Sequence, residues 1–78
     1  MWKTENNRLT KTFELKGFSA IINKLPELAA IANGMNHHPD FTVHDYKRIT
    51  FALWTHSQNS VTEKEHALAR EIDKLFAQ

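Results

Sequence analysis

Cysteine is absent from this chain of 78 residues, and glycine and proline occur only twice each. Without cysteine the chain can form neither disulfides nor thiolate metal sites, which leaves the redox compartment open but fits a cytosolic protein. No stretch approaches the roughly 20 apolar residues of a membrane-spanning helix, and residues 1–7 lack the apolar run of a signal peptide. We therefore expect a cytoplasmic protein with no membrane partner.

Charge of one sign is also scarce, because ten basic and nine acidic side chains are interspersed and leave a net charge of +1. The absence of a basic block predicts no nucleic-acid partner. A chain of this length predicts one domain, residues 1–78, with a thin core. Histidine, by contrast, is abundant: there are five, and four of them lie between positions 37 and 56.

The N-terminal half predicts a β-hairpin followed by helix. Leu9, Phe13 and Leu15 alternate with polar residues, and Asn6-Asn7 suits a turn after a short strand over residues 2–5. Apolar residues at three- and four-residue steps then predict a helix over residues 18–35, which Gly34 can end. Pro26 either kinks this helix or stands in the first turn of a second one.

The C-terminal half predicts two strands and a last helix. A short strand over residues 41–43 and a turn at residues 44–45 precede a long strand over residues 46–56. In this long strand Ile49, Phe51, Leu53 and Thr55 share one face. The last helix opens with a capping box, in which Thr62 caps and Glu65 reaches back. The order ββαββα predicts an α+β fold: an antiparallel four-stranded sheet with its two main helices packed on one face.

Three histidines could carry chemistry. His37 and His38 follow the first helix, and His56 ends the long strand; if that strand is central, the three imidazoles can meet in one cleft. Imidazole donates and accepts protons near neutral pH, so such a group can act as acid and base without a metal. Other interpretations stay open: solvated loop histidines, or zinc ligands. Trp54 can be a pocket wall, an oligomer contact or one exposed aromatic.

These residues resemble a known signature. His37-His38-Pro39, Tyr46 and His56 ten residues later are similar to the motif of the pterin-4a-carbinolamine dehydratases, and the likeness covers almost the whole chain. The resemblance implies dehydration of 4a-hydroxytetrahydropterin to quinonoid dihydropterin, without metal or organic cofactor, by a homodimer or homotetramer.

The resemblance also implies roles for individual residues. His37 and His56 would act as acids at the C4a hydroxyl, and His38 would bind the pterin ring and could act as the base. The residues that it implies for substrate binding are His38, Pro39, Asn33, Trp54, Thr55 and Glu65.

Two positions depart from the family pattern. Asn33 stands where the family usually has an acidic residue, and Glu65 stands where it usually has aspartate. Asparagine can hydrogen-bond a histidine but cannot stabilise an imidazolium as a carboxylate does. These departures favour the alternative function, a non-catalytic module on the same fold that binds a pterin or a protein partner.

Overall fold

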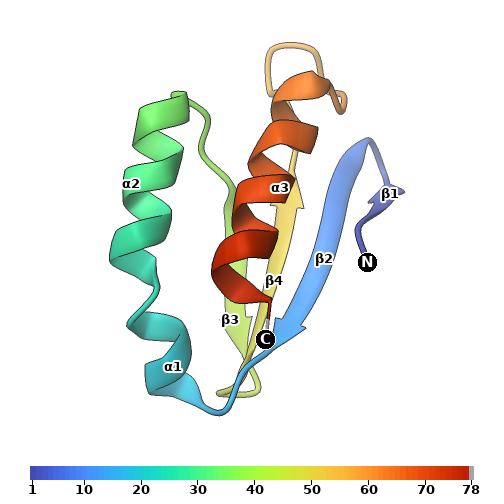
Figure 1. Cartoon of the computed structure of the whole chain (residues 1–78). Coiled ribbons are helices and arrows are strands. Elements are labelled where there is room, and N and C mark those ends of the chain that lie inside the picture. The colour runs from blue at the N-terminus through green and yellow to red at the C-terminus, as the bar shows by residue number, and fades with distance from the viewer. Residues whose placement is uncertain (78) are drawn as a thin grey trace.

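The computed structural model describes residues 1–77 and has the expected α+β architecture. In chain order its elements are β1 (Lys3–Glu5), β2 (Arg8–Glu14), α1 (Phe18–Ile22), α2 (Leu25–Met35), β3 (Asp40–His44), β4 (Arg48–Leu53) and α3 (Glu63–Phe76). All neighbouring strands are antiparallel, in the order β1-β2-β4-β3. The two longer helices, α2 and α3, lie side by side over one face of this sheet (Figure 1).

The predicted turn at Asn6-Asn7 is confirmed, but the long strand is shorter than expected at both ends. Asn6 and Asn7 have φ values of 50° and 63°, the left-handed region that a tight hairpin turn requires. Asp45 and Tyr46 are left-handed as well, so residue 46 belongs to a turn and β4 begins at Arg48. Beyond Leu53 the ladder stops, and Thr55 pairs only with Ser60 in an isolated bridge.

The helical segment is broken at Pro26 and does not end at Gly34. Pro26 lies in the first turn of α2, where its missing N–H leaves no helical hydrogen bond unmade. Helix α2 ends at Met35, and its C-cap Asn36, with a left-handed φ of 51°, turns the chain, so Gly34 lies inside the helix. The continuous helix over residues 18–35 is therefore replaced by two helices.

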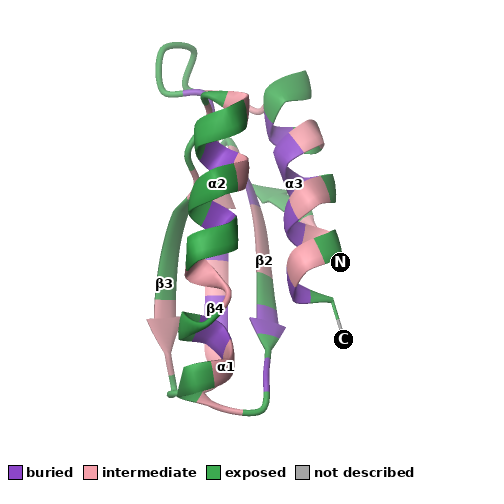
Figure 2. Ribbon diagram, turned by 60° about the vertical axis from the view of Figure 1, so that its left-hand side comes forward, coloured by how far each residue is buried: buried purple, intermediate pink, exposed green. Residues whose placement is uncertain are grey.

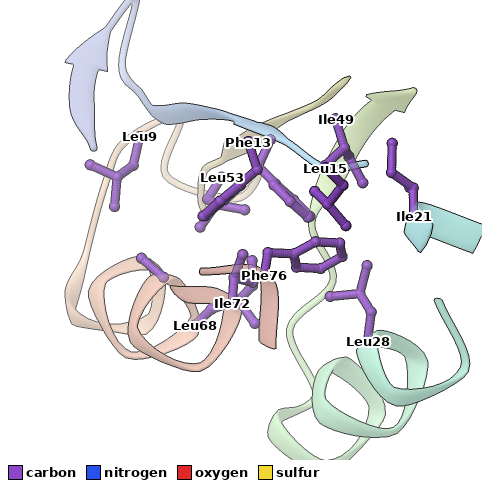
Figure 3. Packing of buried hydrophobic residues seen from close by; sticks show 12 residues of the cluster. Leu9, Phe13, Leu15, Ile21, Leu28, Ile49, Leu53, Leu68, Ile72 and Phe76 are labelled. Carbon is purple, nitrogen blue, oxygen red and sulfur yellow. The ribbon is translucent and has the colours of Figure 1, made fainter. Parts of the chain in front are cut away.

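The core lies between the sheet and the helices (Figure 3). The alternation predicted for β4 is confirmed, because Ile49, Phe51 and Leu53 are buried against the helices. Helix α3 contributes most of the opposing surface, whereas the outer face of α2 is exposed (Figure 2). Among the described residues, no helix has both the length and the apolar character needed to cross a bilayer.

This packing gathers the ends of four helices and strands at one end of the molecule. The C-terminal end of α2, the start of β3, the end of β4 and the N-terminal end of α3 all lie at the top of Figure 1. Since β4 is a central strand, flanked by β2 and β3, its end lies in the middle of this group. The residues expected to carry chemistry are distributed over these four ends.

Candidate functional site

The three predicted histidines lie at the same end of the sheet, but each has its own partners. His37 and His38 follow α2, while His56 follows β4 in the loop that precedes α3. His37 contacts Glu65, His38 contacts Asn33, and His56 lies near Asp40. Within residues 1–77, no hydrogen bond joins two of these histidines. They could therefore act together only by contacting the same bound ligand.

His37 is packed against a buried carboxylate. Its backbone N–H donates to the carbonyl of Ala32, which holds the residue against the end of α2. Its side chain is 13% exposed, and its Nε2 contacts Oε2 of Glu65, whose side chain is fully buried. The contact therefore connects the end of α2 to the first turn of α3.

Glu65 also receives hydrogen bonds from two threonines. The hydroxyl of Thr55, just beyond β4, donates to both carboxylate oxygens at 3.0 and 2.9 Å. The backbone N–H of Thr62 donates to Oε1, as the predicted capping box requires, and the hydroxyl of Thr62 donates to the same oxygen. One carboxylate thus joins α2, β4 and α3 at the site. The capping signal in the sequence identified Glu65 as a cap but gave no sign of its contact with His37.

These contacts decide the charge of Glu65. Burial by itself raises the pKa of its carboxyl, but the N–H of Thr62, the hydroxyls of Thr55 and Thr62 and the imidazole of His37 outweigh it. The pKa of Glu65 is therefore below its usual value, and the group is a carboxylate at neutral pH. Because a carboxylate only accepts hydrogen bonds, His37 must present its Nε2–H to it; in the neutral ring Nδ1 is then an acceptor.

His38 lies on the open side of the corner, by which we mean the end of the sheet that carries His37, His38, His56 and Glu65. Its Nε2 is 2.8 Å from Oδ1 of Asn33, one turn back on α2, and both side chains are exposed. His38 and Pro39 border an open hollow of about 300 Å³, whose other walls are Phe41 and apolar side chains of α2. The hollow thus offers an apolar surface beside one available imidazole.

His56 belongs to a third group, on the sheet face turned away from the helices. Its Nε2 lies 3.9 Å from Oδ2 of Asp40, and its ring centroid is 4.2 Å from that of Trp54. Trp54 Nε1 donates to the same Asp40 oxygen at 3.0 Å, and the guanidinium of Arg8 lies 4.0 Å from the Trp54 ring. The sequence interpretation missed Asp40 and Arg8, because only strand pairing brings them to Trp54.

The corner contains three imidazoles: that of His37, which contacts the carboxylate of Glu65, and those of His38 and His56, which are exposed. Such a set can donate and accept protons on a bound molecule. In the described part of the chain, no three histidine or acidic side chains are placed to hold a metal ion.

Comparisons with known proteins agree with this architecture. Residues 1–75 match the family described as pterin 4 alpha carbinolamine dehydratase. A relative from Sulfolobus acidocaldarius, provisionally named as such a dehydratase, is 43% identical over 95% of this chain and 80% of its own. A similarly named protein from Chloroflexus aurantiacus is 40% identical over 96% of this chain and 80% of its own.

Two solved structures share the fold. A transcriptional coactivator/pterin dehydratase from Brucella melitensis superposes with a TM-score of 0.88 at 29% identity, over 97% of this chain and 82% of its own. A pterin dehydratase-like protein identified as a RuBisCO assembly factor in the alpha-carboxysome superposes with a TM-score of 0.76 at 20% identity, over 100% of this chain and 89% of its own. At that identity the second likeness shows the fold alone.

Proposed function

The chain belongs to the pterin 4 alpha carbinolamine dehydratase family, and from this premise we propose that it dehydrates 4a-hydroxytetrahydropterin to quinonoid dihydropterin. The reaction would support recycling of the pterin cofactor. The observation that carries the proposal is the corner itself, where the His37–Glu65 pair lies at the same end of the sheet as two exposed histidines.

The reaction needs proton transfers and no redox step. The hydroxyl at C4a leaves as water once it has received a proton, and a ring nitrogen loses a proton to give the product. In this proposal His37 and His56 are the acids at the hydroxyl, and His38 binds the ring and accepts the nitrogen proton. A positioned acid or base contributes about 10²–10⁴-fold to such a step.

The surroundings suggest where the pterin lies. The hollow beside His38 and Pro39 has apolar walls, which suit a flat ring whose edge meets a few polar groups. Asn33 reaches the site through His38. Thr55 and Glu65 are buried, so we place them behind His37, where they orient the imidazole and do not touch the substrate. Trp54, on the other face, is placed beside His56.

The test is direct. Chemically generated 4a-hydroxytetrahydropterin is followed as it dehydrates, with the wild-type protein, with the His38→Ala and His56→Ala variants and without protein. His66→Ala is the matched control, since His66 is an exposed histidine on α3 that borders Trp2 and Leu9 and does not line the hollow beside His38. We expect acceleration by the wild type and by His66→Ala, and a large loss in the other two. No acceleration by a folded wild-type protein would refute the proposal.

One observation favours a second candidate, a pterin-binding or partner-binding module without catalysis. The His37 side chain is only 13% exposed and its Nε2 is occupied by Glu65, so little of this imidazole is available to a substrate. In the same assay this candidate predicts binding of dihydrobiopterin, measured by calorimetry, with no acceleration of dehydration.

We also propose that the chain works as a homodimer or homotetramer in the cytoplasm. β3 is an edge strand, so one side of its backbone is free to pair. Large apolar side chains are exposed near it and on α1, namely Phe18, Ile22, Phe41 and Tyr46. Analytical ultracentrifugation would test this, and a monomer at high micromolar concentration would contradict it.

A further inference from the structure

Asp40 lies where the chain enters β3, on the sheet face opposite the helices. The next residue, Phe41, packs against the core residue Phe51, with ring centroids 5.9 Å apart. Successive strand residues point to opposite faces, so Asp40 points away from the helices. Asp40 pairs with Ala52 of β4, and Trp54, two residues beyond Ala52, falls on the same face.

One oxygen of Asp40 serves two aromatic side chains. Oδ2 accepts the Nε1–H of Trp54 at 3.0 Å and lies 3.9 Å from Nε2 of His56. The two rings in turn contact each other, with centroids 4.2 Å apart. Asp40 therefore contacts His56 in two ways. Its carboxylate lies near the imidazole, and it also holds the indole that packs against the imidazole.

We propose that Asp40 is a positioning residue of the dehydratase, which orients Trp54 and His56 toward the leaving hydroxyl. The inference rests on the proposed function and deepens it, because it makes His56 the principal proton donor to the leaving hydroxyl. The other two histidines have different partners. His38 contacts a neutral amide, and the carboxylate of Glu65 is shared between His37 and two threonines.

Two charged side chains lie beside the Trp54–His56 pair in the described part of the chain. Asp40 from β3 is the acidic group, and Arg8 from β2 is the basic group, stacked on Trp54 with its guanidinium carbon 4.0 Å from the ring centroid. Arg8 lies against the Trp54 ring, whereas Asp40 lies within ion-pair distance of His56 itself. The His56 and Asp40 side chains are 62% and 59% exposed, so water screens the pair and its effect is modest.

Removing the charge of Asp40 should have a small effect on His56, because both side chains are exposed. Exposed ion pairs of this kind correspond to shifts of about 0.2–0.7 pH unit in a titration midpoint. Removing the charge of Asp40 should therefore make His56 lose its proton at a pH lower by that amount. If His56 is the acid, the rate falls about 1.5- to 5-fold on the alkaline side of the pH profile and is kept on the acidic side.

The experiment compares Asp40→Asn with the wild type, because asparagine still offers an oxygen to Trp54 but carries no charge. The His56 ring protons are titrated by NMR, and kcat is measured across the same pH range. Asp45→Asn is the matched control. Asp45 is another exposed aspartate, 2.9 Å from His44 at the far end of β3. Its substitution should therefore leave the NMR titration of His56 unchanged.

The expected result is a lower His56 midpoint in Asp40→Asn, with the alkaline limb of kcat displaced by the same amount and restored in Asp40→Glu. An unchanged His56 titration, or an equal loss of rate at every pH, would overturn the inference. Failure of the proposed function looks different: the wild type would not accelerate dehydration at all. In that case the NMR titration still decides whether Asp40 controls the proton on His56.

Discussion

Glu65→Gln tests how far the buried carboxylate holds the corner together. The substitution keeps the size of the side chain and removes its charge. It also turns one acceptor oxygen into an NH2 donor, although the wild-type carboxylate accepts from Thr55 and from Thr62 and contacts Nε2 of His37. At least one of these donors must then lose its acceptor or rotate away.

The magnitude follows from the number and kind of these bonds. Hydrogen bonds to a charged group contribute about 1.5–3 kcal/mol and neutral ones about 0.5–1.5 kcal/mol. Removing the charge also removes the cost of burying it, which offsets part of the loss. We expect Glu65→Gln to lower the free energy of unfolding by about 1–3 kcal/mol at neutral pH. In a domain of this size each kcal/mol lowers Tm by about 4–8 °C.

The difference between wild type and variant should depend on pH in one direction. The pKa of Glu65 is lowered in the folded protein. Its carboxylate therefore contributes its full stabilisation above the pKa of the unfolded chain, and the contribution is lost as the pH falls through the lower folded-state pKa. Below that pH the wild-type group is protonated and resembles glutamine, so the difference in stability shrinks.

Urea unfolding followed by tryptophan fluorescence measures this difference at a series of pH values. Glu63→Gln is the matched control, since Glu63 lies in the same helical turn but is exposed. We expect it to cost less than Glu65→Gln, no more than about 1 kcal/mol, because its charge interacts mainly with the helix N-terminus. A Glu65→Gln cost that is near zero, or that stays constant from neutral to acidic pH, would refute the reasoning.

Three further outcomes are expected. His38→Ala should lose about 10²–10⁴-fold in turnover while its unfolding midpoint is unchanged, because this imidazole is exposed at the hollow; near-wild-type turnover would remove His38 from the mechanism. Asn33→Asp should place a carboxylate 2.8 Å from Nε2 of His38 and raise the pH at which this ring loses its proton, as followed by NMR, at a cost of about 0.3–1 kcal/mol near the helix C-terminus; an unmoved His38 titration would contradict it. Dialysis against EDTA should leave turnover and Tm unchanged, and stoichiometric zinc lost together with activity would show the opposite.

Much of the fold could be predicted from the sequence, because it depends on local chemistry. The alternation of Ile49, Phe51 and Leu53 identified the buried face of β4, and Asn6-Asn7 identified the first turn. The capping box at Thr62 placed the start of α3. Periodicity and turn chemistry act over a few residues, so they can be recognised before any tertiary contact is known.

The tertiary structure decided what local patterns leave open. Whether Pro26 kinks one helix or begins another depends on how the segment packs, and the structure shows the second. The sequence pointed to three histidines, but packing directs His37 to a buried carboxylate and His56 to an aspartate on the opposite face of the sheet. The direction of a side chain at the end of a helix or strand is set by elements distant in the chain. These partnerships therefore became visible only once α2, β4 and α3 were packed together.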